Sequence, residues 1–263
     1  MNIKFVDIHS HIQFPEFDAD REEVVSRMKN AGVFSVVVGT DLKTSQTAVK
    51  LAEKHENLFA SVGLHPNGVI SEKFDGKAYR ELVSNPKTVA VGECGLDYFR
   101  TEGTEEKKKK QKEIFEKQIN LALEFDKPLM IHCRNAYEDM LEILAAYKKE
   151  NGEKLRGNIH FFAGNWSIAQ KFLELGFTLS FTGVITFAEQ YDEVIKNAPL
   201  DMIMSETDCP YVTPASHRGK RNEPSYVTEV VKRIAAIKGE GFEKVSEAMA
   251  NNAIRVFGVS ASG

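Results

Sequence analysis

The chain of 263 residues is long enough for one large α/β domain, and its hydrophobic content of 42% is ordinary for a soluble globular protein. The net charge of −4 excludes a global positive field, so binding of nucleic acid would need a local basic patch. No segment reaches the roughly 20 apolar residues of a membrane span, and the N-terminus lacks the apolar core of a signal peptide. Because the three cysteines also lack disulfide spacing, we expect a cytoplasmic protein without membrane contact.

The first half of the chain alternates short apolar runs with helical patterns. The run that begins at Lys4 predicts a buried strand and ends in His9 and His11. The helical pattern over 20–31 carries acidic residues early and has Gly32 as its stop. Further strands are predicted at 34–38, 58–62 and 88–91, and further helices at 44–55, 76–83 and 104–125.

The second half continues the alternation. Strands are predicted at 128–131, 158–162, 177–180 and 202–204, and helices at 136–149, 167–175, 191–197, 225–238 and 243–257. Strands that are each followed by a helix indicate parallel βαβ units, and eight such units indicate a (β/α)8 TIM barrel. An open doubly wound sheet is the alternative. No linker divides the chain, so we expect residues 1–263 to form one domain.

Side chains that bind metals follow several of these strands. His9 and His11 point to the same side because side chains alternate along a strand, and two imidazoles can hold one cation. A pair of loop histidines without a metal is the alternative. The barrel is favoured because only a closed barrel brings all of the strand ends to one place. The candidate ligands at predicted strand carboxyl ends are His9, His11, Glu93, His132, His160 and Asp208.

Each cysteine directly follows a candidate ligand: Cys94 after Glu93, Cys133 after His132 and Cys209 after Asp208. Alternation turns Cys94 and Cys133 away from the ligands and toward the helices. We therefore interpret the three thiols as small buried apolar groups rather than as ligands.

Several motifs, in order along nearly the whole chain, resemble those of the TatD family. They are His9-x-His11, GECGLDY at 92–98, IHCR at 131–134, HFFAG at 160–164, ETDCP at 206–210, HRGKRNEP at 217–224 and NAIRVF at 252–257. The family comprises (β/α)8 metal-dependent hydrolases of the amidohydrolase superfamily, and its characterised members are metal-dependent deoxyribonucleases, typically 3′-to-5′ exonucleases. The sixth-strand motif usually reads His-Cys-Phe-(Ser/Thr)-Gly, and the residues that differ here are not ligands in the family.

The resemblance implies two divalent metal ions, which could be Mg, Mn, Zn or Ni. His9, His11, Glu93 and Asp208 would hold one ion, and Glu93, His132 and His160 would hold the other, with Glu93 as the bridge. Two cations need a shared anion between them and can stabilise both oxygens of an in-line displacement. Asp208 would accept the proton of the attacking water as general base. Glu206 is an alternative catalytic base, or a structural carboxylate.

Basic residues near the strand ends are candidates for binding phosphate. Arg134 lies on the same side as His132, and Arg218, Lys220 and Arg221 lie in a loop beyond the eighth strand, where barrels often bind phosphate. Ordinary surface charge is the alternative for Lys220 and Arg221. His65 could contact a phosphate or be a structural histidine. Trp166 and Phe187 could stack on a base, although we favour packing in the core.

Three functions compete on these observations. The first is a metal-dependent phosphodiesterase acting on DNA, single-stranded or at chain ends, with RNA as a further substrate. The second is a hydrolase of another ester or amide, such as a D-aminoacyl-tRNA, a phosphotriester or a lactone, because one fold supports many chemistries. The third is a non-enzymatic module that binds metal or nucleic acid. The basic loop favours a phosphate-bearing substrate, and we expect the deoxyribonuclease to act as a monomer.

Overall fold

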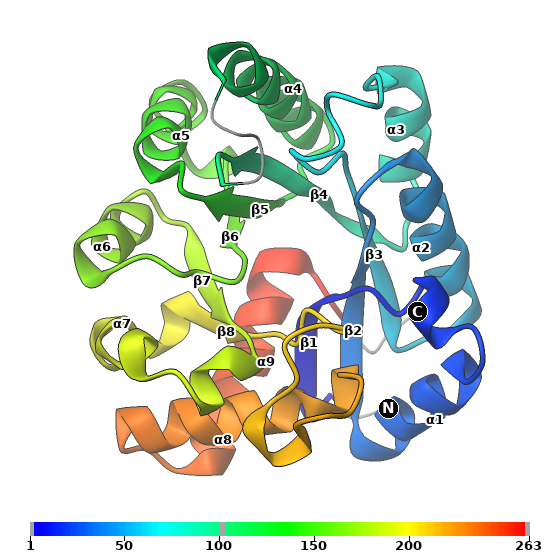
Figure 1. Cartoon of the computed structure of the whole chain (residues 1–263), viewed down its shortest axis with the longest axis vertical. Helices are drawn as coiled ribbons and strands as arrows, with labels where there is room; N and C mark the ends of the chain where they lie inside the picture. Colours follow the sequence, from blue (N-terminus) through cyan, green and yellow to red (C-terminus); the bar gives the residue numbers. More distant parts are fainter. Residues whose placement is uncertain (1–2, 100–103, 261–263) are drawn as a thin grey trace.

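Eight parallel strands follow one another around a barrel, and each is hydrogen-bonded to the next in sequence order (Figure 1). The computed structural model describes residues 3–99 and 104–260. The strands are β1 (Phe5–Ser10), β2 (Val33–Val38), β3 (Leu58–Val62), β4 (Thr88–Asp97), β5 (Leu129–Arg134), β6 (Gly157–Ile159), β7 (Thr178–Phe181) and β8 (Ile203–Ser205). An isolated parallel bridge between Ser10 and Cys209 connects the end of β1 to the segment after β8. The predicted (β/α)8 barrel is confirmed.

Helices surround this sheet (Figure 1). They are α1 (Arg21–Ala31), α2 (Leu42–Lys54), α3 (Gly76–Val83), α4 (Glu105–Glu124), α5 (Tyr137–Asn151), α6 (Trp166–Glu174), α7 (Asp192–Asn197), α8 (Val227–Lys238) and α9 (Phe242–Phe257). With helices outside and side chains filling the inside, strands are covered on both faces. This explains why all six residues of β2 are buried and why all but Ser35 are apolar, without alternation.

Local sequence signals set the helix boundaries. Helix α2 begins two residues earlier than predicted, because the Asp41 side chain accepts a hydrogen bond from the Thr44 amide while Thr44 Oγ accepts one from the Asp41 amide. Helix α1 ends at Gly32, whose left-handed φ of 71° suits glycine.

Strand β4 extends six residues past its predicted end, because 94–97 pair in register with 131–134 of β5.

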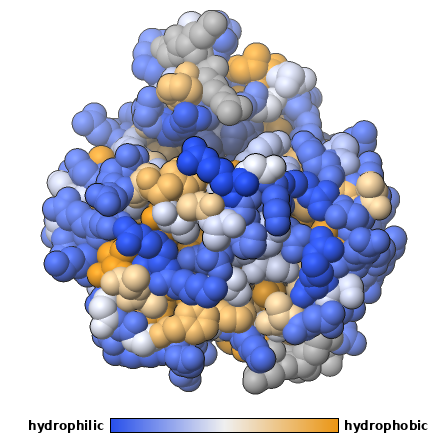
Figure 2. All heavy atoms as spheres, turned by 60° about the horizontal axis from the view of Figure 1, so that its bottom comes forward, coloured by the Kyte–Doolittle hydropathy of each residue, from blue (hydrophilic) through white to orange (hydrophobic). Residues whose placement is uncertain are grey.

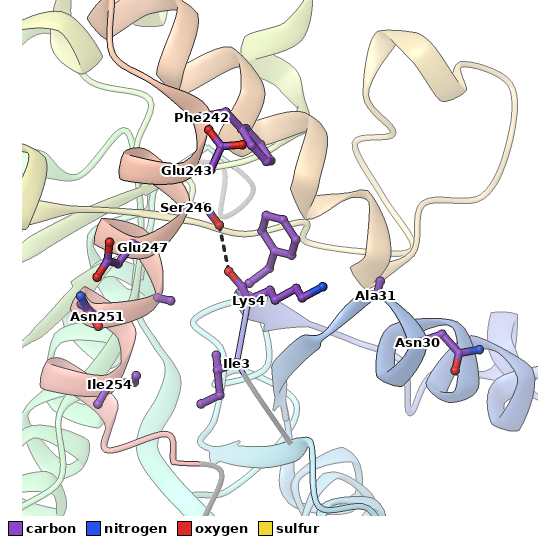
Figure 3. A pocket seen from close by; sticks show the side chains of 12 residues that line it. Ile3, Lys4, Asn30, Ala31, Phe242, Glu243, Ser246, Glu247, Asn251 and Ile254 are labelled. Atoms are coloured by element: carbon purple, nitrogen blue, oxygen red, sulfur yellow. Dashed lines mark hydrogen bonds between the residues drawn. The ribbon is translucent and has the colours of Figure 1, made fainter.

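Helix α9 lies at the amino end of the barrel. Ser246 Oγ donates to the Lys4 carbonyl just before β1, as Figure 3 shows. Asn252 donates to the Leu200 and Ile203 carbonyls next to β8, and Arg255 donates to the Asp201 carbonyl. Asn252 and Arg255 therefore hold the last helix against the residues around the start of β8. A surface pocket between α9, α1 and the start of β1 lies at this end, opposite to the strand carboxyl ends.

The surface is predominantly hydrophilic in the view of Figure 2, where hydrophobic residues form separate patches. Within the described ranges, no helix has the length and apolar character needed to span a membrane.

Candidate metal centre

The barrel brings all six predicted ligands to the carboxyl ends of the strands. His9, Glu93 and His132 lie within β1, β4 and β5, His160 directly follows β6, and Asp208 lies three residues past β8. The donor atoms of these side chains converge, although the strands that supply them span nearly the whole chain. His9, His11, Glu93 and His160 are buried, whereas His132 and Asp208 are partly exposed.

Two of the ligands lie where the regular pairing of the strands is interrupted. The register between β1 and β2 shifts between Asp7 and Ser10, which brackets His9. The register between β4 and β5 shifts between Val91 and Cys94, which brackets Glu93. Irregularities of this kind change the direction of a side chain and are frequent beside active sites.

Glycines permit the irregularity at Glu93. Gly92 and Gly95 have φ values of 156° and 135°, and a Cβ atom at either position would clash with a carbonyl oxygen of β5, that of Met130 or of His132. Larger residues at these two positions would therefore separate β4 from β5 and displace Glu93.

One set of donor atoms faces Glu93 Oε2. His9 Nε2 and His11 Nε2 lie 3.2 Å apart, and they lie 3.5 and 4.0 Å from Glu93 Oε2. Asp208 Oδ1 completes the set at 3.8 Å from His9 Nε2 and 3.4 Å from His11 Nε2. Ligands bound about 2.1 Å from a tetrahedral metal lie roughly 3.4 Å from one another, so this donor set fits a divalent cation.

A second set of donor atoms faces the other oxygen of the same carboxylate. Glu93 Oε1 lies 2.9 Å from His132 Nδ1, 3.1 Å from His160 Nε2 and 3.3 Å from His65 Nε2. Glu93 thus divides its two oxygens between two groups of imidazoles. This is the arrangement expected of a carboxylate that bridges two cations.

Outer carboxylates orient the rings of the second set. His132 directs Nδ1 at Glu93 and Nε2 at Asp97 Oδ2, 3.1 Å away. His160 directs Nε2 at Glu93 and Nδ1 at Glu206 Oε1, 3.3 Å away. Such partners fix which ring nitrogen is free to bind a metal. His132 is therefore set to bind through Nδ1 and His160 through Nε2.

The two oxygens of Glu206 are already engaged. Oε1 also accepts a hydrogen bond from the Phe161 amide at 2.7 Å, and Oε2 accepts one from Ser180 Oγ at 2.7 Å. A fully buried carboxylate with this many donors is suited to holding His160 in place. The geometry favours the structural alternative over a role for Glu206 as catalytic base.

Charges within the cluster are strongly coupled. Burial alone would raise the pKa of Glu93, but the nearby His65 and His160, together with hydrogen bonds from His132 and His160, hold that pKa well below its ordinary value. Burial likewise opposes a charge on His160, yet Glu206 and Glu93 raise its pKa well above the ordinary value. The pKa of Asp208 is lowered because a hydrogen bond from His11 and the charges of His9 and His160 outweigh its burial. The carboxylates of Glu93 and Asp208 are thus ionised at neutral pH and able to attract cations.

His65 is part of this cluster rather than at its edge. Its Nδ1 accepts a hydrogen bond from the Asn67 amide at 3.1 Å, so in the neutral ring the proton is on Nε2. That Nε2 faces Glu93 Oε1. Its spacing also permits metal binding with Glu93 and His132, but the tautomer fixed by Asn67 makes His65 a hydrogen-bond donor.

The four predicted basic contacts differ in their surroundings. Arg134, Arg218 and Lys220 are exposed, and none of them forms an ion pair with another described residue. Arg221 instead forms a bidentate ion pair with Asp20, at 2.8 and 2.7 Å, and donates to the Glu16 carbonyl at 2.6 Å. Arg221 therefore anchors its loop to the start of α1 and is not a free cation.

The predictions for the cysteines and aromatic residues have different outcomes. Cys94, Cys133 and Cys209 are buried in the apolar core, as predicted, and burial raises the pKa of each thiol. Trp166 packs against the same core. The prediction that Phe187 packs in the core is wrong, because its side chain is 50% exposed in the loop after β7.

Sequence reasoning missed Asp97 and Asp7. Asp97 is 1% exposed and orients His132; its spacing of four from Glu93 along β4 places both on one face, which was an available signal. Asp7 is fully buried and accepts hydrogen bonds from the amide and hydroxyl of Thr207, at 2.8 and 2.7 Å. It thereby fixes the segment between β8 and Asp208, and no motif indicated that role.

Comparison with known proteins identifies the family. The sequence model of the family described as TatD related DNase matches residues 6–258. The chain belongs to the TatD family. It is therefore a metal-dependent hydrolase, and its buried histidine and glutamate groups are able to bind metal.

Relatives with curated descriptions match along their full length. The chain is 40% identical over 258 residues to the uncharacterized metal-dependent hydrolase YabD of Bacillus subtilis, covering 97% of this chain and 99% of that protein. It is 33% identical over 264 residues to the 3'-5' ssDNA/RNA exonuclease TatD of Citrobacter rodentium, covering 97% and 98%. Among solved structures, the TatD homologue YjjV of Escherichia coli superimposes with a TM-score of 0.90 at 28% identity, covering 99% and 100% of the two chains.

Proposed function

We propose that this protein is a metal-dependent deoxyribonuclease that removes nucleotides from the 3′ end of single-stranded DNA, acting as a cytoplasmic monomer. The observation that carries this proposal is the division of the Glu93 oxygens between two groups of donors, with Oε2 facing His9 and His11 and Oε1 facing His132 and His160. A pair of cations held in this way suits in-line displacement at phosphorus. The relative described as an exonuclease on single-stranded DNA and RNA supports the same substrate.

The residues around Glu93 would hold two divalent ions, one with His9, His11 and Asp208 and one with His132 and His160. When bound, such ions polarise a phosphoryl oxygen and make water a better nucleophile near neutral pH. Proton transfer and phosphate binding would be carried out by side chains of the protein.

Asp208 is placed to accept a proton. Its pKa is lowered, so the carboxylate is ionised at neutral pH, and Oδ1 lies beside His9 and His11 at the carboxyl end of the barrel. We propose that Asp208 takes the proton of the attacking water as the oxygen–phosphorus bond forms. The bond from phosphorus to the 3′ oxygen then breaks, that oxygen takes up a proton, and a nucleoside 5′-monophosphate leaves.

Arg134, Arg218 and Lys220 would bind the phosphates next to the scissile bond. They are exposed and without ion-pair partners among the described residues, in a chain whose net charge is −4. Arginine can grip a phosphate with two hydrogen bonds, whereas lysine acts as a point charge. His65 would donate from Nε2 to a phosphate oxygen when Glu93 is engaged by metal.

A substrate panel tests this proposal. Protein reconstituted with Mn or Zn is incubated with single-stranded DNA, duplex DNA, RNA, a D-aminoacyl-tRNA, a phosphotriester and a lactone. We expect the highest kcat/KM with single-stranded DNA, and we expect chelation of the metal to abolish it. Turnover of the lactone, the phosphotriester or the aminoacyl ester, with none of the DNA substrates, would replace the proposal by the second function considered above.

A further inference from the structure

Two exposed phenylalanines at the carboxyl end of the barrel each lie under an arginine. Phe187, in the loop after β7, is 50% exposed, and the guanidinium of Arg218 from the loop after β8 lies 5.7 Å from its ring centroid. Phe99, just past β4, is 57% exposed, and the guanidinium of Arg134 at the end of β5 lies 3.9 Å from its ring centroid. Both pairs have cation–π geometry.

Most of the exposed large hydrophobic side chains lie at the same end of the barrel as these two phenylalanines. The large hydrophobic side chains that are exposed within the described ranges are Ile70, Phe99, Phe187, Tyr211 and Ile254. All of them except Ile254 lie in loops that follow strand carboxyl ends, and Ile254 lies on α9 at the other end. Phe99 and Phe187 therefore lie at the end of the barrel that carries the candidate metal centre.

The Phe187 ring is presented by an ordered loop. The short helix η3 (Gly183–Thr186) precedes it, and Thr186 Oγ accepts a hydrogen bond from the Ala215 amide at 2.8 Å. Arg233 Nε donates to the Ile185 carbonyl at 3.1 Å. These bonds join the loops after β7 and β8 to each other and to α8, so the backbone segments next to Phe187 and Arg218 are positioned before any ligand binds.

The arginines of both pairs remain free to bind an anion. No carboxylate of the described chain forms an ion pair with Arg134 or Arg218, in contrast to Arg221 and Asp20. Each pair therefore offers an apolar ring face beside a positive charge that no carboxylate of the described residues neutralises. A nucleotide with an unpaired base presents the matching features, a flat π face and a nearby phosphate.

We propose that Phe187 with Arg218, and Phe99 with Arg134, form two stacking sites for unpaired bases at separate places on the rim of the metal centre. This inference rests on the proposed nuclease function and deepens it. A base inside a duplex has both faces covered by its neighbours and cannot occupy such a site. The two sites therefore select single-stranded ends without reading sequence, because every base has a π face.

Oligonucleotides that lack a single base distinguish a loss of stacking from a general loss of binding. One oligonucleotide carries all its bases, and a second series carries a single abasic sugar at each of the last three positions from the 3′ end. Wild type is compared by KM and kcat with Phe187→Ala, Phe99→Ala and Phe187→Tyr. The matched control is Ile254→Ala, which alters an exposed apolar residue at the opposite end of the barrel. Metal content and thermal unfolding are measured for each variant.

We expect Phe187→Ala to raise KM for the complete oligonucleotide on the order of tenfold, with kcat little changed, since stacking acts on binding. Phe187→Tyr, which keeps an aromatic ring, should have the KM of wild type, and so should Ile254→Ala. On the substrate with one particular abasic position, Phe187→Ala and wild type should have equal KM values. Phe99→Ala should match the wild-type KM on the substrate with a different abasic position. Unchanged KM in Phe187→Ala, or an equal loss on every abasic substrate, would overturn the inference. A wild-type enzyme that cleaves none of these strands would instead overturn the proposed function.

Discussion

The Nε2 atoms of His9 and His11 face each other at 3.2 Å, with the two rings nearly perpendicular at 79°. His11 Nδ1 donates to the Val38 carbonyl at 2.8 Å, so the neutral His11 ring directs a lone pair from Nε2 toward His9. His9 Nδ1 has no hydrogen-bond partner among the described residues. In the His9 tautomer that carries its proton on Nδ1, a cation between the two Nε2 atoms would satisfy both lone pairs at once.

The first prediction concerns the number of bound metal ions and follows from the position of Glu93 between two sets of donors. Protein reconstituted with Mn or Zn should contain about two ions per chain, because each Glu93 oxygen faces its own set of donors. Glu93→Ala removes the anion between two like charges and should lower the stoichiometry to one ion or less. Elemental analysis of dialysed protein measures this directly, and two fully occupied sites in Glu93→Ala would rule out the bridge.

Metal binding should release protons near neutral pH. The pKa values of His132 and His160 are raised by hydrogen bonds and charges from Asp97, Glu206 and Glu93, so the metal-free rings retain protons that a metal must displace. A raised pKa means that metal affinity increases as the pH rises through it. Calorimetry in buffers of different ionisation enthalpy counts the released protons. At pH 7 the Glu206→Gln variant should release fewer protons on metal binding than wild type. The control variant Glu229→Gln, which alters a surface ion pair on α8, should release as many protons as wild type.

Asp97 should matter to metal affinity although it is not a ligand. Its carboxylate holds the Nε2–H of His132, and removing such a partner typically lowers affinity 10- to 100-fold. We expect a loss of about this size in Asp97→Ala, measured by competition with a chelating dye. Asp139→Ala is the matched control, since Asp139 contacts Tyr98 and Lys112 and no histidine of the site. Equal affinities for Asp97→Ala and wild type would show that the ring is oriented by other contacts.

Lys220 and Arg221 are adjacent but should behave differently. Lys220→Ala should raise KM for oligonucleotides and flatten the salt dependence, to which each neutralised phosphate of a single strand contributes about 0.7. Arg221→Ala breaks the pair with Asp20 and should instead cost about 1 kcal/mol of unfolding free energy, measured by denaturant titration. If Arg221→Ala keeps full stability but loses oligonucleotide binding, the anchoring role is wrong.

The fold and the ligand types could be predicted from the sequence because both follow from local rules. Apolar runs between helical patterns indicate parallel strands, and a barrel collects their carboxyl ends, so His132 and His160 needed no long-range information. The irregular register around His9 and Glu93 has no sequence signal beyond the glycines Gly92 and Gly95.

Contacts between distant segments could not be predicted. Arg221 pairs with Asp20, a residue 201 positions away, and nothing in a basic loop indicates that one of its charges is already neutralised. Phe187 was expected in the core because aromatic residues are usually buried, and only the arrangement of the loops after β7 and β8 exposes it.

The most direct test of the account is the time course of a single-stranded oligonucleotide labelled at its 5′ end, in protein reconstituted with metal. We expect a ladder of products shortened one nucleotide at a time from the 3′ end. We also expect metal-replete Asp208→Asn to be slower on the order of 10²-fold, in the range of general-base effects. Intact oligonucleotide after exposure to metal-replete wild type, or equal rates for wild type and Asp208→Asn, would contradict the account.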